Sequence, residues 1–383
     1  MKQTASIIST YASDVSGVCS SLYELGGLTV MHDASGCNST YNTHDEPRWY
    51  DMDSMVYLSG LTEMEAIMGD DEKLIGDIVS AANELSPKFI AIAGTPIPMM
   101  IGTDFAAVAS VVQRRTGIPS FGFSTNGMHS YLSGAGMAYE AFARRMVNPN
   151  MKRDSSPAIS VNILGITPLD FSVNGSAEAI KEMLTESGFN IISSWAMGST
   201  LEEIKDSGRA NVNLVVSYSG LPAAKALYEI FGTPYVVGTP IGAALSKKIM
   251  EDLKCSAESG KAVISYEKRD ILDSTDMVIV GESIFSESLA FALTDEYSKN
   301  VKVLCPLETD TSLMLTGDFA AQDEDDLIPY FKTAKAVIAD PLYYPICPES
   351  AQFISLPHEA FSGRIYRDDI PNIIGSRFLY WKF

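Results

Sequence analysis

The feature that most constrains this chain is a repeated pairing of short apolar runs with helical patterns. Each run is rich in β-branched residues, ends in small or turn-forming residues, and precedes a segment with helical periodicity. The runs are Phe89–Ala93, Ala158–Leu164, Val212–Val216, Met277–Val280, Val301–Leu304 and Ala336–Ala339. Apolar strands that alternate with helices are typical of parallel sheets with crossover helices. The pattern therefore predicts an α/β protein.

The length of the chain predicts more than one domain. Its 383 residues exceed the size at which a single hydrophobic core usually stops growing. The polar stretch of residues 148–157 contains two prolines and separates one group of strand–helix units from the next, and a weaker break lies at residues 257–261. We therefore expect an N-terminal α/β domain at residues 1–153, a second at 154–258, and a third at 259–383 with a C-terminal tail.

Two helices have clear boundary signals. Thr62 and Glu65 form a capping-box pair, and Pro222 and Gly232 mark the start and end of another helix. The apolar face predicted for the first helix consists of Ile67, Leu74, Ile78, Ala82 and Leu85.

Charge and motif content exclude several classes of protein. The 48 acidic and 28 basic residues give a formal net charge of −20, which repels nucleic acids and anionic membranes. No apolar run approaches the length of a membrane span or a signal peptide, so we expect a cytoplasmic protein. Neither a P-loop nor a GxGxxG fingerprint is present, so we expect no nucleotide to be bound by this chain. The five cysteines are scattered, which favours free thiols or metal ligands over disulfides.

One strand end concentrates reactive side chains. The strand of residues 28–31 leads into HDASGCNSTYNTHDEPRW, which brings His32, Cys37, His44 and Arg48 into one loop region. Such strand ends are where ligands bind in open α/β sheets. Small neighbours of Cys37 allow backbone N–H groups to approach a bound anion or a cluster sulfur. The residues alone leave two interpretations open. Cys37 is either a functional thiol or, as free cysteines often are, only a small buried apolar residue.

Several motifs occur in an order that resembles the nitrogenase component 1 family, which includes the MoFe-protein subunits, their cofactor-assembly scaffolds and the dark-operative tetrapyrrole reductases. These motifs are the HxxxGC loop (32–37), LTEMEAIMGDDEKL (61–74), FIAIAGTPIPMMIGTD (89–104), FGFSTNGMHSYLSGAG (121–136), WAMGSTLEEI (195–204) and NLVVSYSG (213–220). The resemblance implies three doubly wound, Rossmann-like domains with mainly parallel sheets. It also implies an iron–sulfur cluster, of the [4Fe-4S] kind, at a subunit interface. The implied partners are a second subunit, identical or paralogous, and a nitrogenase iron protein-like ATPase that supplies electrons.

The sequence departs from the family pattern at ligand positions. Pro96 stands where the family has a cluster cysteine, and Ser217 stands where it has the cysteine of the active-site cofactor. Ser133 and Met137 replace the glutamine and histidine of the substrate loop. We therefore expect no FeMo-type cofactor and no reduction of dinitrogen.

The resemblance also defines the candidate metal ligands. Cys37 matches a cluster cysteine of the family. Another family cysteine is replaced by Ser13 and Asp14, with Cys19 offset a few residues further on. Asp14 either replaces the missing cysteine or caps a helix. Because a cubane cluster needs four ligands, the remaining ones would come from across a dimer interface.

The candidate substrate-handling residues come from strand ends and from the resemblance. His358, in LPHEAFSGRIY, resembles a cofactor histidine of the family and either binds or protonates a substrate, or caps a loop. His129 is a second candidate proton donor, the alternative being an exposed loop histidine. The residues expected to contact a small organic substrate are His44, Arg48, Ser133, Ser217 and Tyr218.

These features favour a catalytic component of a two-component, nitrogenase-like reductase, in which electrons pass from the ATPase through an interface cluster to the substrate. One alternative is a scaffold or carrier on which a metallocofactor is built without turnover. A second is an α/β small-molecule binding protein that has lost its metal, in which Cys37 and Cys19 would be replaceable.

Overall fold

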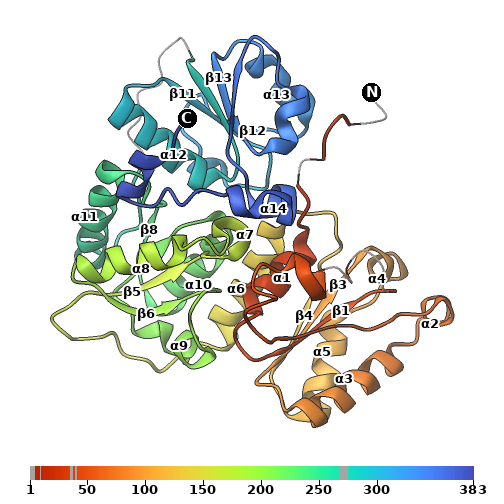
Figure 1. Cartoon of the computed structure of the whole chain (residues 1–383). Coiled ribbons are helices and arrows are strands. Elements are labelled where there is room, and N and C mark those ends of the chain that lie inside the picture. The colour runs from red at the N-terminus through yellow and green to blue at the C-terminus, as the bar shows by residue number, and fades with distance from the viewer. Residues whose placement is uncertain (1–4, 9, 35–37, 39–40, 267–274) are drawn as a thin grey trace.

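The computed structural model describes the chain apart from residues 1–4, 9, 35–37, 39–40 and 267–274. Cys37, the central residue of the predicted cluster loop, therefore lies outside the described residues. Three parallel sheets follow one another along the chain, each with helices packed against it (Figure 1). The predicted α/β fold with three mainly parallel sheets is confirmed.

The first sheet has four strands in the order β2-β1-β3-β4. Its strands are β1 (Leu28–His32), β2 (Met55–Leu58), β3 (Ile90–Gly94) and β4 (Ser120–Phe123). Its helices are α1 (Asp14–Leu22), α2 (Glu63–Met68), α3 (Asp71–Leu85), α4 (Pro96–Ile101), α5 (Phe105–Thr116) and α6 (Tyr131–Arg145). Alternate residues of β3 enter different cores: Ile90 and Ile92 pack with α3 and α5, whereas Ala91 and Ala93 pack with α1 and α6. Both faces of β3 are therefore covered, which explains why this strand is a continuous apolar run.

The second sheet has five strands in the order β6-β5-β7-β8-β9. Its strands are β5 (Ser160–Leu164), β6 (Asn190–Ser194), β7 (Val212–Val215), β8 (Tyr235–Val237) and β9 (Val263–Ile264). Its helices are α7 (Pro168–Phe171), α8 (Ser176–Glu186), α9 (Leu201–Lys205), α10 (Leu221–Phe231) and α11 (Ala243–Ser259). Because β9 pairs with β8, this sheet extends past residue 258 to Ile264.

The third sheet has five strands in the order β12-β11-β10-β13-β14. Its strands are β10 (Met277–Val280), β11 (Val301–Cys305), β12 (Phe319–Ala320), β13 (Ala336–Ala339) and β14 (Gln352–Ser355), and its helices are α12 (Ser283–Tyr297), α13 (Glu324–Phe331) and α14 (Glu359–Ser362). After α14 the chain returns to the second sheet, where the Gly375 N–H donates to the Pro240 carbonyl at 2.7 Å. The C-terminal tail thus joins the second and third sheets.

The helix predicted between Thr62 and Leu85 is two helices. The capping box of Thr62 and Glu65 is present, but α2 ends at Gly69, which has a left-handed φ of 65°. Asp70 then caps α3 through a bond from the Glu72 N–H. Ile67, predicted to face the core, is 70% exposed because it belongs to the short first helix. The second predicted helix is α10, whose proline lies in its first turn and which ends at Gly232, as predicted.

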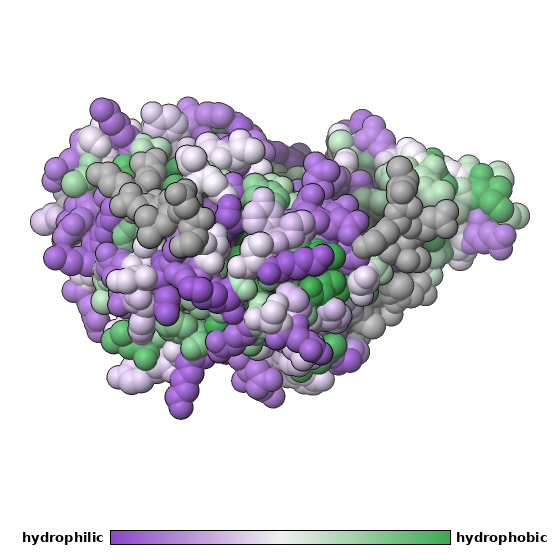
Figure 2. Space-filling view, turned by 90° about the horizontal axis from the view of Figure 1, so that it is seen from above, coloured by the Kyte–Doolittle hydropathy of each residue, from purple (hydrophilic) through white to green (hydrophobic). Residues whose placement is uncertain are grey.

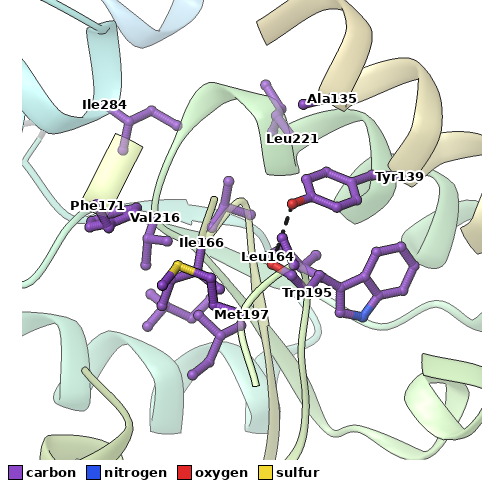
Figure 3. Close-up of a cluster of buried hydrophobic side chains, with 14 of the residues drawn as sticks. Ala135, Tyr139, Leu164, Ile166, Phe171, Trp195, Met197, Val216, Leu221 and Ile284 are labelled. Carbon is purple, nitrogen blue, oxygen red and sulfur yellow. Dashed lines mark hydrogen bonds between the residues drawn. The ribbon is translucent and has the colours of Figure 1, made fainter. Parts of the chain in front are cut away.

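Helix α6 joins the first sheet to the rest of the molecule. Figure 3 shows Tyr139 of this helix beside Trp195, which follows β6, and Ala135 beside Leu221 of α10. The Tyr139 hydroxyl lies 3.4 Å from the Trp195 carbonyl. On its other side α6 contacts α1 so closely that a Cβ atom at Gly134 would overlap the Asp14 carbonyl. The two helices therefore meet backbone to backbone.

Each sheet reverses its strand order beside its first strand. This places a crevice at the carboxyl ends of β1 and β3, of β5 and β7, and of β10 and β13. Ligands in open α/β sheets bind at such switch points. The loop after β1 leads to the undescribed residues around Cys37.

Candidate functional site

The crevices of the second and third sheets face one another across an enclosed cavity of about 30 Å³. The cavity is lined by Asp170 after β5, Glu282 after β10, Asp340 after β13 and His358 after β14. Its other walls are largely apolar. Ligand sites are typically lined by apolar residues with a few convergent polar groups, and the lining of this cavity has that composition.

Asp170 is the centre of this site. It lies in the short helix α7, which starts at the capping residue Thr167. The Tyr131 hydroxyl, from α6, donates to Asp170 Oδ1. The hydroxyls of Thr167 and Ser217 each donate to Oδ2 at 2.8 Å. The Asp170 carboxylate therefore links α6, which packs on the first sheet, to the second sheet through hydroxyl groups.

Glu282 is a second buried carboxyl group, with partners of a different kind. It caps α12 and accepts the backbone N–H groups of Tyr218 and Ile284 at 3.0 Å on Oε1, and that of Phe285 at 2.8 Å on Oε2. Backbone N–H groups can only donate, so they favour the ionised carboxylate. Burial opposes them and raises the pKa of Glu282.

The pKa of Asp170 is raised to about 7 by its burial and by the negative charge of Glu282. Unlike the backbone donors of Glu282, the hydroxyl partners of Asp170 can accept as well as donate, so they tolerate a protonated carboxyl. Asp170 is therefore the member of the pair that holds a proton near neutral pH. A carboxyl group with such a pKa, in a closed site, is suited to general acid catalysis.

His358 faces Asp170 across the cavity. Its Nδ1 accepts the Ala360 N–H at 3.2 Å, so the neutral ring carries its hydrogen on Nε2. Nε2 is buried without a hydrogen-bond partner and lies 3.8 Å from Asp170 Oδ1. Burial lowers the pKa of His358 to about 3, so the ring is neutral at physiological pH. His358 caps α14, as one of its predicted roles requires, and also directs an N–H group into the cavity.

Two of the predicted substrate residues meet at this site, and a third touches it through its backbone. Ser217 and His358 both face Asp170, whereas Tyr218 contributes its N–H group to Glu282. Asp170 was missed, although it follows a predicted strand. Tyr131 was also missed, although it lies within the predicted substrate loop.

Arg48 lies elsewhere and is bound internally. It is buried and donates to Glu46 at 2.6 Å, to Glu24 at 2.9 Å, and to the carbonyls of Ala196 and Ser20 at 2.8 and 2.7 Å. A substrate contact would have to break these bonds. The substrate contact predicted for Arg48 therefore stays a prediction, and these hydrogen bonds give the residue a structural role.

The other predicted residues are spread over separate surfaces. His44 lies in a π-helical turn (Tyr41–Asp45), with Nε2 3.9 Å from Asp45. His129 is exposed and lies 3.4 Å from Glu308 in an open cleft of about 720 Å³ between the first and third sheets. Ser133 lies in the first turn of α6. None of these three lines the enclosed cavity in the part of the chain that the structure describes.

The candidate metal ligands among the described residues do not form a metal site. Both oxygens of Asp14 accept backbone N–H groups, from Val15 and Gly127 at 2.8 Å and from Asn126 at 2.9 Å. Cys19 is fully buried in an apolar cluster, where burial raises the pKa of its thiol. Outside the undescribed gaps, no group of three His, Cys, Asp or Glu side chains is placed to hold a metal ion. An iron–sulfur cluster does not fit the described residues alone.

None of the helices in the described ranges combines the length and the apolarity needed for a bilayer span.

The fold and the order of the motifs define a class of oxidoreductase component. The chain matches the family described as nitrogenase component 1 type oxidoreductase over residues 26–282, more than half of its length. It belongs to this family. A solved nitrogenase structure, Cp1 at pH 6.5, superimposes with a TM-score of 0.66 over 94% of this chain and 86% of that one, at 14% identity. This likeness shows the fold.

Curated relatives include both catalytic and assembly proteins. The chain is 24% identical to the nitrogenase iron-molybdenum cofactor biosynthesis protein NifE of Bradyrhizobium diazoefficiens, over 75% of this chain and 50% of that protein. It is 30% identical to a subunit of the light-independent protochlorophyllide reductase of Leptolyngbya boryana, over 39% of this chain and 29% of that protein. It is 24% identical to the nitrogenase molybdenum-iron protein alpha chain of Clostridium pasteurianum, over 52% and 37%. The chain thus spans half or less of these relatives' lengths.

Proposed function

We propose that this chain is the catalytic component of a cytoplasmic, nitrogenase-like reductase that reduces a small organic substrate other than dinitrogen. One observation carries the proposal: a member of an oxidoreductase family encloses a carboxyl group with a near-neutral pKa and a neutral histidine at its facing strand ends. Reductions of organic substrates consume protons together with electrons. Asp170 is positioned to supply a proton, and His358 is positioned to orient the group that receives it.

The residues of the site have different roles in the protonation of the substrate. Asp170 holds a transferable proton toward the cavity, and Tyr131 and Ser217 hold its carboxyl group in place. His358 presents an N–H group that orients a bound acceptor atom. The apolar walls exclude bulk water, which strengthens both interactions.

Electron supply is the part of the proposal that depends on partners. An iron–sulfur cluster, held by Cys37 and by ligands from across a subunit interface, would bring electrons to the chain. Cys19 and Asp14 stay candidate ligands, although each would have to leave its present surroundings. The donor would be an ATP-hydrolysing iron protein.

An exposed apolar surface on the first domain supports such a partner. Helices α2 and α4 pack together and expose Met64, Met68, Met99 and Met100, the last of which is 80% exposed. Figure 2 shows apolar side chains gathered at the right-hand end of the molecule, where these helices lie. Large exposed apolar patches on proteins often mark sites of interaction with another protein. We propose this α2–α4 surface as the docking site of the electron donor.

The test begins with protein purified without oxygen. Iron and sulfide analysis, with EPR spectra of the reduced protein, should show a cluster that Cys37→Ala diminishes and Cys255→Ala, at an exposed thiol, leaves intact. Material free of iron, both alone and with its partner, would refute the cluster. Met68→Asp with Met100→Asp should weaken partner binding without changing the circular dichroism spectrum, and unchanged binding would remove the docking site.

A cofactor-assembly scaffold is the second candidate. It is favoured by Pro96 and Ser217, which replace family cysteines, and by the likeness to a cofactor biosynthesis protein. A scaffold would transfer its metal cargo to an acceptor protein and would show no substrate-dependent oxidation of the electron donor. A reductase would show that oxidation, and Asp170→Asn would slow it.

A further inference from the structure

The wall of the enclosed cavity carries acidic side chains and, within the described ranges, no lysine or arginine. Its acidic residues are Asp170, Glu282 and Asp340. Asp340 resembles Glu282 in its surroundings, because it accepts the N–H groups of Leu342 at 2.9 Å and of His358 at 2.8 Å. Backbone donors favour the ionised form of a carboxyl group. Burial opposes ionisation and raises the pKa of all three carboxyl groups. Each one that ionises adds a negative charge that no positive side chain in the described lining balances.

One polar atom in this wall has no partner. His358 Nε2 is buried, carries a hydrogen, and makes no hydrogen bond. It lies 3.8 Å from Asp170 Oδ1, which is too far for a direct bond. Polar groups at such a separation are commonly bridged by a third group placed between them. A group that bridges the two needs an acceptor atom for His358 and, when Asp170 is ionised, a hydrogen for its carboxylate, whereas a cationic group without an acceptor atom would pair with the carboxylate alone.

The space available limits what can enter. The cavity of about 30 Å³ has room for roughly two water-sized groups. The aromatic rings of Phe171, Phe285 and Phe361 close its sides. It therefore receives the end of a molecule or a very small molecule whole.

We propose that this cavity takes an uncharged or positively charged polar group, such as an amide, an imine or a protonated amine, and rejects carboxylates and phosphates. The claim that this group is the reducible end of the substrate rests on the proposed function. An amide would place its oxygen toward His358 Nε2 and its N–H toward Asp170. An anion would add a negative charge beside Glu282 and Asp340 in surroundings of low dielectric constant, with no cation to compensate.

The test compares small probes of matched shape. Formamide and formate have the same number of non-hydrogen atoms and differ in charge, and methylammonium supplies the cationic case. Their binding to the full chain is measured by saturation-transfer NMR titration at about pH 8, where Asp170 is ionised. We expect formamide and methylammonium to bind at least about tenfold more tightly than formate. Equal or tighter binding of formate, or no binding of any probe, would overturn the proposal.

Variants assign the selectivity to this cavity. Asp170→Asn should reduce the difference in affinity between formamide and formate. Glu308→Gln, which removes a carboxylate from the separate open cleft, should leave this difference unchanged. His358→Phe should weaken the binding of formamide more than the binding of methylammonium. Selectivity that survives Asp170→Asn and His358→Phe in variants with native circular dichroism would place binding elsewhere and overturn the proposal.

The two proposals fail in different ways. Probe binding needs neither a cluster nor electrons, so a protein that shows the expected selectivity but no turnover would contradict only the proposed function. A protein that reduces a substrate through an anionic end group held in this cavity would contradict only the selectivity.

Discussion

Replacing Arg48 with methionine should destabilise the protein strongly. The Arg48 side chain is 5% exposed, and its two carboxylate partners, Glu46 and Glu24, are 0% and 11% exposed. Removing one member of a buried ion pair leaves an uncompensated charge and costs about 3–5 kcal/mol. Arg48→Met also leaves the carbonyls of Ser20 and Ala196 without their donor. The expected loss in free energy of unfolding is therefore at least about 3 kcal/mol.

The assay is urea unfolding followed by circular dichroism, with a surface ion pair as the control. Arg115 lies 2.9 Å from Glu72, but the two side chains are 43% and 69% exposed. Arg115→Met should therefore cost only about 0–1 kcal/mol. Adding Glu46→Gln to Arg48→Met should recover part of the loss, because the orphaned charge is removed. An Arg48→Met protein as stable as Arg115→Met would refute the structural role and would favour the substrate contact predicted from the sequence.

Other predictions concern packing and pH. Gly134→Ala should lower the free energy of unfolding by about 1–3 kcal/mol, because the added Cβ would overlap the Asp14 carbonyl. Gly76→Ala, whose Cβ meets open space in α3, should leave the stability unchanged or raise it. Equal effects of the two substitutions in thermal unfolding would contradict the close contact of α6 with α1. The pKa of Asp170 is higher in the folded than in the unfolded chain, so its contribution to stability is complete below about pH 4 and is lost as the pH rises toward about 7. The stability of wild type relative to Asp170→Asn should fall over this range, and a rise would refute the assignment. The pKa of His358 is lowered, so the stability of wild type relative to His358→Gln should instead rise from about pH 3 to about pH 6.5, and a flat difference would contradict its burial.

The central strands were predictable because both of their faces are buried. Residues such as Ile90 and Ala91 pack against opposite helical layers, so the strands are continuous apolar runs. The edge strands were missed because they are short or partly exposed, as β2 (Met55–Leu58) and β12 (Phe319–Ala320) are. The break at Gly69 was missed because the apolar spacing continues across it.

Residues of the site were predictable from their place in the sequence only where they follow a predicted strand. Ser217 lies two residues after β7, which was predicted, so the strand-end rule finds it. His358 follows β14, a strand that was not predicted, and it was found through the family resemblance. The pKa of Asp170 depends on its burial between the layers of the three sheets and on Glu282, far away in the sequence, neither of which local patterns encode. Arg48 was assigned to a substrate because the sequence gives no sign that Glu46 and Glu24 surround it.

The titration of the Asp170 carboxyl group decides whether the facing strand ends form a proton-donating site. Carbon-13 NMR of protein labelled at aspartate carboxyl carbons, with the signal assigned by its absence in Asp170→Asn, gives the pKa of this residue. We predict a pKa of about 7 for Asp170, because burial and the charge of Glu282 disfavour ionisation. A value near 4, which is ordinary for an exposed aspartate, would contradict the claim that these facing strand ends form a proton-donating site.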